Sequence, residues 1–167
     1  MNKTLIVIFV GAVIALLALS IFQEDLLKES MESPTNPQDN SYEGWRTDYQ
    51  ESINKAKENN RNLLILFTGS DWCPPCKMML KNVWSKESFK TFAKKNLELL
   101  VLDFPQGKKL SEAQSTQNQK LAGQYNVSTY PLVLILNPEG VEISRMNFHG
   151  ELAEGFIERY QEVIKKK

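Results

Sequence analysis

Hydrophobic and polar positions divide the chain into three parts. No charged side chain occurs between positions 4 and 22, whereas residues 23–41 are polar, include two prolines and show no hydrophobic periodicity. From Tyr42 onward, apolar residues recur at helical and strand spacing. We therefore expect a folded domain over residues 42–167, a flexible linker over residues 23–41 and a separate apolar segment over residues 1–22.

The apolar segment is long enough to cross a membrane. As a helix it would be roughly 28 Å long, close to the ~30 Å hydrocarbon thickness of a bilayer. Lys3 precedes it, and Glu24 and Asp25 follow it, which predicts that the N-terminus stays in the cytoplasm and the rest of the chain crosses. Residues 1–22 are therefore expected to be a signal-anchor. The alternative is a signal peptide that is removed by cleavage near the small residues at 18–20.

From position 42 the pattern predicts alternating helices and strands. Residues 137–140 have the composition of a turn, and residues 115–119, in the middle of one helix, are polar and expected to face solvent. Strands that alternate with helices predict an α/β fold, with a mixed central sheet flanked by helices on both faces. The expected helices are 44–59, 74–81, 86–95, 108–125 and 152–163, and the expected strands are 63–68, 97–103, 131–136 and 141–148.

Composition narrows the choice of partners and ligands. Twenty Lys and Arg balance twenty Asp and Glu, so nucleic acid is not an expected partner. Two cysteines and one histidine are too few for an ordinary four-ligand zinc site, and no metal or other cofactor is expected. Met78 and Met79 beside Cys76 suggest soft-metal binding as an alternative. One of two adjacent methionines is, however, expected to face the core.

The two cysteines lie in the sequence Cys73-Pro74-Pro75-Cys76, directly after the expected strand 63–68. A helix that begins between them places Cys73 where the helix N–H groups and dipole favour a thiolate. Cys76 lies one turn later, close enough for a disulfide without backbone movement. This spacing predicts a redox-active dithiol at the C-terminal end of a strand, where sites of open α/β sheets lie.

Three features together resemble the thioredoxin superfamily. They are the sequence Trp-Cys-Pro-Pro-Cys-Lys at 72–77, the sequence Thr-Tyr-Pro at 129–131 and Gly150 before the last helix. The chain from Tyr42 onward is similar to exported, membrane-tethered thioredoxin-like proteins of bacteria. The resemblance implies a thioredoxin fold in the cell envelope, on the outer (periplasmic) side of the membrane. If the signal is cleaved, the protein would instead be periplasmic or secreted.

The resemblance also implies a role for each residue of the motif. Cys73 would attack a substrate disulfide, and Cys76 would resolve the resulting mixed disulfide. Pro131 resembles the cis-proline of the family, which lets the preceding backbone pair with substrate. The expected partners are protein disulfides and an electron donor in the membrane. The expected substrate-binding residues are Trp72, Pro74, Pro75, Tyr130 and Pro131.

Other polar residues near the motif are expected to have ordinary roles. Asp71 is interpreted as a solvated turn residue rather than a proton handler, and Lys77 as an exposed helix lysine. His149, the single histidine, lies near the end of an expected strand. It is expected on the surface and outside catalysis.

The sequence departs from familiar thioredoxins at Phe67. Those proteins carry a buried acidic residue about six positions before the first cysteine, whereas residues 64–67 here are apolar. Cys76 must therefore lose its proton to water or to another base. We expect slow resolution, with the mixed disulfide accumulating below pH 7.

The two prolines between the cysteines bear on the direction of electron flow. Proline has no N–H, so the dipeptide donates no hydrogen bond to Cys73. A less stabilised thiolate means a more stable disulfide, which favours a reductase or a mid-range exchanger over a strong oxidase. Two other functions stay open: a non-catalytic thioredoxin-fold binding module or metal chaperone, and a disulfide isomerase.

Overall fold

A computed structural model describes residues 42–165 of this protein. The expected anchor or signal peptide at 1–22 and the expected linker at 23–41 lie outside the described residues, and both stay predictions. Every helix within residues 42–165 is too short or too polar to span a bilayer.

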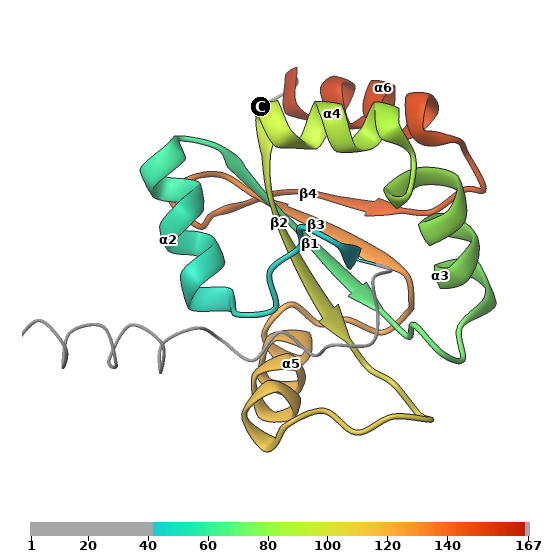
Figure 1. Ribbon diagram of the computed structural model, residues 1–167. Helices are drawn as coiled ribbons and strands as arrows, with labels where there is room; N and C mark the ends of the chain where they lie inside the picture. The colour runs from blue at the N-terminus through green and yellow to red at the C-terminus, as the bar shows by residue number, and fades with distance from the viewer. Residues whose placement is uncertain (1–41, 166–167) are drawn as a thin grey trace, which may run out of the picture. The chain divides into compact units, whose positions relative to one another are not determined.

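The centre of the domain is a four-stranded mixed sheet (Figure 1). The strand order is β2-β1-β3-β4; β1 and β2 are parallel, and β3 is antiparallel to both β1 and β4. The central strand β1 is apolar from Leu63 to Phe67 because helices bury both of its faces. The four strands are β1 (Asn62–Thr68), β2 (Leu97–Asp103), β3 (Leu132–Leu136) and β4 (Glu142–Asn147).

Alternate side chains of β1 enter two separate hydrophobic cores. Leu64 and Leu66 belong to the core on one face, whereas Leu63, Ile65 and Phe67 belong to the core on the other. Helices therefore cover both faces (Figure 1), and the predicted α/β architecture is confirmed. The first face carries α3 (Pro74–Met79), the π-helix η2 (Leu80–Trp84), α4 (Glu87–Asn96) and α6 (Ala153–Lys165), and the second carries α2 (Tyr49–Asn59) and α5 (Glu112–Gln124).

The predicted start of the first helix was wrong. Helix α2 begins at Tyr49 rather than at position 44, because Asp48 caps it: the Asp48 side chain accepts the Glu51 N–H at 2.7 Å. Before this cap, Arg46 forms an isolated parallel bridge with Leu100 of β2. The residues before the cap therefore extend the edge of the sheet.

Helix α5 also begins later than predicted, and its polar middle is not fully exposed. Ser111 caps the helix by accepting the Gln114 N–H at 3.2 Å. Asn118 is 5% exposed, and its side chain donates to the Asp103 carbonyl at 2.9 Å. A buried amide is tolerated there because the end of β2 supplies its acceptor.

Two further expectations about helices were wrong. The α-helix after the cysteines ends at Met79 and continues as the π-helical turn η2, which brings Val83 and Trp84 into the core. Leu152, which has the spacing of the buried face of the last helix, precedes α6 and is 60% exposed.

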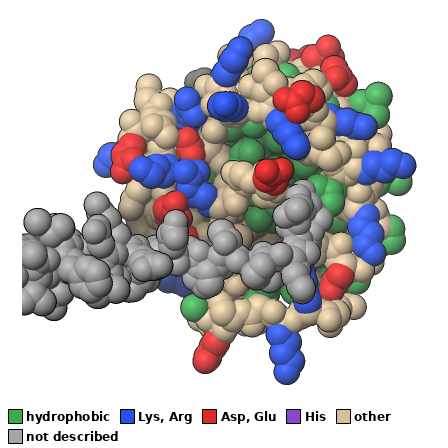
Figure 2. All heavy atoms as spheres, in the orientation of Figure 1, with side chains coloured by type: hydrophobic (Ala, Val, Ile, Leu, Met, Phe, Trp, Pro, Cys, Tyr) green, Lys and Arg blue, Asp and Glu red, His purple; other side chains and the backbone are tan. Residues whose placement is uncertain are grey.

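Surface charge is mixed in sign. On the face shown in Figure 2, Lys and Arg side chains are interspersed with Asp and Glu. A face of this kind has no extended basic area of the sort that binds the phosphates of nucleic acid.

Candidate active site

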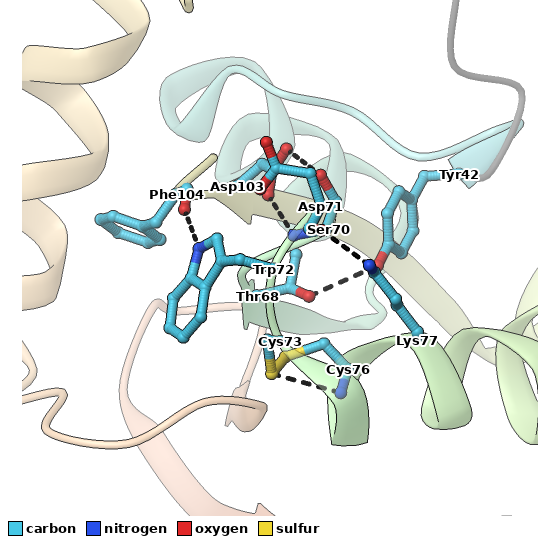
Figure 3. The surroundings of a disulfide bond; sticks show 10 residues. All are labelled: Tyr42, Thr68, Ser70, Asp71, Trp72, Cys73, Cys76, Lys77, Asp103 and Phe104. Atoms are coloured by element: carbon cyan, nitrogen blue, oxygen red, sulfur yellow. Dashed lines mark hydrogen bonds between the residues drawn. A yellow bond between two sulfur atoms is a disulfide. The ribbon is translucent and has the colours of Figure 1, made fainter. Parts of the chain in front are cut away.

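Cys73 and Cys76 form a disulfide, with their Cα atoms 5.3 Å apart (Figure 3). Both side chains are well covered: Cys73 is 3% exposed and Cys76 1%. The expected pairing is therefore present. Of the two sulfurs, that of Cys73 belongs to the slightly more accessible residue.

The backbone around Cys73 explains its position. Strand β1 ends at Thr68, and the Cys73 N–H donates to the Gly69 carbonyl at 3.0 Å. Cys73 has extended backbone geometry and caps α3, and its Sγ atom accepts the Cys76 N–H at 3.3 Å. The prediction that the first cysteine caps a helix is confirmed.

The two prolines occupy the first two positions of α3, and both are exposed. Proline is well suited to the first turn because the N–H groups there have no partner within the helix. Neither residue can donate to Cys73 Sγ. The second helical position, where an N–H could otherwise reach the capping side chain, therefore has no donor.

Trp72 lies in an aromatic cluster beside the cysteines. Its Nε1 donates to the Phe104 carbonyl at 2.7 Å (Figure 3), and its ring centroid lies 5.9 Å from that of Tyr130. The Phe104 and Tyr130 rings are 5.1 Å apart. The structure thus brings together two of the predicted substrate-binding residues. Phe104, which the sequence did not single out, is the third member of the cluster.

The Tyr130–Pro131 peptide bond is cis, as the resemblance implied. Leu132, the next residue, pairs with Phe67 near the end of β1. Tyr130 and Pro131 therefore lie at the same end of the sheet as the turn that leads to Cys73. Their predicted role in substrate binding stays a prediction.

Phe67 occupies the position of the family's buried acid. Its side chain is fully buried, with its ring centroid 6.5 Å from that of Phe104 and 6.4 Å from that of Tyr125. The apolar character expected from the sequence is confirmed in three dimensions. An aromatic ring at this position cannot accept a proton from Cys76.

Asp71 is more than the solvated turn residue expected from the sequence. Its carboxylate accepts the backbone N–H of Gln106 at 3.0 Å and also that of Gly107, both in the loop between β2 and α5. The Gln106 N–H is the main reason that the pKa of Asp71 lies below its ordinary value. Sequence reasoning missed these contacts because the partners lie 35 and 36 positions away.

The remaining neighbours agree with their expected placement. Lys77 is exposed, and its Nζ donates to the Asp71 carbonyl at 2.6 Å. His149 is exposed. Met79 is fully buried and Met78 is 50% exposed, so one of the pair faces the core as predicted.

Within the part of the chain that the structure describes, no group of three His, Cys, Asp or Glu residues could hold a metal ion. The polar groups around the dithiol are instead bonded to backbone and to one another. The two sulfurs can carry an electron pair by forming and breaking the disulfide between them.

Comparison with known proteins agrees with this geometry. The model of the thioredoxin-like family matches residues 44–138. The chain belongs to the thioredoxin-like family. It is 31% identical over 121 residues to the disulfide bond reductase DsbH of Chlamydia pneumoniae, covering 72% of each chain.

Solved structures give the same result. A structure described as DsbH oxidoreductase superposes with a TM-score of 0.69 at 30% identity, covering 74% of this chain and 85% of that one. A thioredoxin from Thermus thermophilus superposes with a TM-score of 0.54 at 20% identity, covering 72% and 88%, and supports the fold alone. This thioredoxin-like protein is therefore a thiol–disulfide oxidoreductase whose dithiol is the Cys73–Cys76 pair.

Proposed function

We propose that this protein is a membrane-anchored disulfide reductase of the bacterial cell envelope. Its Cys73–Cys76 dithiol would give an electron pair to the disulfides of other proteins. The two cysteines would react with the substrate. The residues that contact the substrate chain would be Trp72, Pro74, Pro75, Tyr130 and Pro131.

The reaction needs two exchanges. In the first, the Cys73 thiolate attacks one sulfur of the substrate disulfide; a Cys73–substrate bond forms, the substrate S–S bond breaks, and one substrate thiolate leaves and takes up a proton. In the second, Cys76 loses its proton and attacks Cys73 Sγ. The Cys73–Cys76 disulfide forms, and the second substrate sulfur leaves as a thiol. The substrate is reduced by two electrons and the enzyme is oxidised by two.

The observation that supports electron transfer from this protein to its substrates is the small number of hydrogen-bond donors to Cys73 Sγ. The Cys76 N–H lies 3.3 Å from Cys73 Sγ, while the prolines at the first two helical positions have no N–H to offer. A weakly stabilised thiolate makes the reduced state less stable and the disulfide more stable. The likeness to a protein described as a disulfide bond reductase supports the same direction.

A reductase in an oxidising compartment needs a continuing supply of electrons. We propose that a dithiol donor in the membrane regenerates the Cys73–Cys76 pair, and that residues 1–22 hold the domain beside it. Cleavage after the apolar segment would instead release the domain into the periplasm or the medium.

The reduction potential tests the direction. The domain is equilibrated with mixtures of reduced and oxidised glutathione, and the fraction of dithiol is measured by alkylation and mass spectrometry. We expect a potential nearer to the about −270 mV of thioredoxin than to the about −120 mV of a strong oxidant. A value above about −150 mV would contradict the reductase proposal.

Trapping in cells tests the partners and the location. The full-length Cys76→Ser variant cannot resolve its mixed disulfides, so substrates should stay attached to Cys73. We expect these adducts in the membrane fraction and sensitive to protease added outside the cytoplasmic membrane. The Cys73→Ser variant is the matched control and should trap none. Adducts in the soluble periplasmic fraction would support cleavage instead.

A further inference from the structure

Three consecutive residues before Cys73 bond to the last residue of β2 and to the loop that follows it. The Ser70 N–H and hydroxyl donate to the Asp103 carboxylate at 2.9 and 2.6 Å. The Asp71 carboxylate accepts from the N–H groups of residues 106 and 107, and Trp72 Nε1 donates to the carbonyl of residue 104. We call this set of bonds between residues 70–72 and 103–107 the turn–loop contact. Figure 3 shows the part of it that involves Asp103 and Phe104.

The turn–loop contact fixes the Trp72 indole beside the dithiol. On one side of the ring lies Gly69, where an added Cβ would be 2.4 Å from the ring. On another side, the Phe104 carbonyl holds Nε1. Because Trp72 is still 38% exposed, its outer surface is open to a docking chain. Its orientation depends on where the loop holds the Phe104 carbonyl.

Asp71 is the charged centre of this contact. Two consecutive loop N–H groups point at its carboxylate, and Lys77 of α3 donates to its carbonyl. The pKa of Asp71 is lowered, first by the Gln106 N–H, so the carboxylate is ionised at neutral pH. The charged form is the one that the loop amides bind most strongly. Asp71, in the turn after β1, thus connects that turn to α3 and to the β2–α5 loop.

We propose that Asp71 is a positioning residue for protein substrates: its carboxylate holds loop 104–107 so that the Phe104 carbonyl fixes the Trp72 indole as one wall of the substrate-docking surface. This inference rests on the proposed function, since it concerns how that reductase engages its substrates. The Asp71 carboxylate bonds to the loop and its carbonyl to Lys77, and within the described residues the carboxylate forms no hydrogen bond with either sulfur. Its removal should therefore affect docking and leave the redox equilibrium in place.

The kinetic test compares a protein disulfide with a small one. Asp71→Ala and wild type are assayed for reduction of insulin, with dithiothreitol as donor, and for exchange with oxidised glutathione. We expect the KM for insulin to rise about tenfold in Asp71→Ala, the factor for losing a charge-assisted hydrogen bond. The kcat, the exchange rate with oxidised glutathione and the equilibrium constant with glutathione should each change less than about twofold.

Hydrogen exchange gives a readout that does not depend on activity. In wild type the amides of Gln106 and Gly107 are expected to be protected, because they donate to Asp71. In Asp71→Ala their exchange should speed up by about tenfold or more, and acrylamide should quench Trp72 more readily. Asp71→Asn keeps a side-chain oxygen as acceptor and should give intermediate values for both KM and exchange.

Glu139→Ala is the matched control. It also removes one acidic side chain, but from the exposed turn between β3 and β4, at the other end of β3 from Pro131. It should leave KM, exchange at 106–107 and quenching of Trp72 unchanged. Thermal melting of each variant checks that the fold is intact.

The outcomes separate this inference from the proposed function. If wild type reduces insulin and Asp71→Ala has the wild-type KM, or if the loop amides exchange at the wild-type rate in Asp71→Ala, the positioning role is overturned. A parallel change in the equilibrium constant with glutathione would also overturn it, because Asp71 would then act on the sulfurs. If wild type itself reduces no disulfide, the proposed function fails first, and this inference fails with it.

Discussion

Position 75 controls how many hydrogen bonds the Cys73 sulfur can accept. Pro75 is the second residue of α3, and an N–H there could donate to the capping sulfur. Replacing it in Pro75→Ala restores that donor and stabilises the thiolate, so the potential should rise by about 30 mV, the shift equivalent to one such bond. Equilibration with glutathione measures it. Pro138→Ala, in the β3–β4 turn, is the control, and an unchanged potential in Pro75→Ala would contradict this account.

Phe67 determines how Cys76 is deprotonated. With a buried aromatic ring in place of a carboxylate, the resolving thiol must give its proton to water or a more distant base. The rate of resolution should therefore rise with pH, and the mixed disulfide should accumulate below pH 7. Acid quenching of single turnovers, followed by mass spectrometry, measures the adduct. Cys76→Ser provides the fully trapped standard at each pH, and rapid resolution at pH 6 without detectable adduct would contradict the prediction.

The sequence predicted those properties of residues near the dithiol that depend only on their neighbours along the chain. The helix cap by Cys73, the two prolines that lack N–H groups and the buried apolar position 67 are all local features. The contacts of Asp71 could not be predicted from the sequence, because its partners lie in the loop after β2.

At the scale of elements, two glycines should respond to the same substitution with opposite signs. In Gly69→Ala the new Cβ would meet the Trp72 ring at 2.4 Å, so the turn between β1 and α3 must shift, and the free energy of unfolding should fall by about 1–3 kcal/mol. In Gly123→Ala, near the end of α5, the new Cβ meets open space, and stability should rise by about 0.5–1 kcal/mol.

Urea unfolding monitored by circular dichroism measures both changes, and tryptophan fluorescence reports the displaced indole in Gly69→Ala. Equal and small effects in the two variants would show that Trp72 is not held against position 69.

The elements themselves were mostly predictable, and the errors lay at their ends. Hydrophobic spacing located β1, β2 and β3, because buried strands must be apolar. The turn composition at 137–140 located β4, whose side chains are mostly not buried. Helices α2 and α5 began later than predicted, at the caps Asp48 and Ser111. The signal was present in the sequence, since each cap is followed three residues later by Glu51 or Gln114. The π-helical turn η2 had no comparable local signal.

At the scale of the whole domain, Glu98 connects parts that are distant in sequence. It is 6% exposed; its carboxylate lies 2.6 Å from Arg46 Nη1, and it accepts from the Asn59 side chain at 2.8 Å. These contacts tie β2 to the bridge before α2 and to the end of α2. Glu98→Gln weakens them and should lower the free energy of unfolding by about 1–3 kcal/mol.

Urea unfolding checks the Glu98 prediction. Glu58→Gln is the matched control, because Glu58 pairs with Lys55 on the exposed surface of one helix, at 2.8 Å. It should change stability little, since exposed pairs contribute little. If the free energy of unfolding fell equally in the two variants, the buried Glu98 carboxylate would contribute no more to stability than the exposed Glu58 carboxylate.

The sequence by itself determined the order of helices and strands, the mixed sheet, and the two sulfurs that carry the chemistry, because hydrophobic periodicity and a helix start act within a few residues. Tertiary structure decided which groups surround those sulfurs. The turn before Cys73, the loop after β2 and the Tyr130–Pro131 segment come from three distant stretches. The pairing of β1 with β2 and β3 brings them together, and no local pattern encodes contacts of that range.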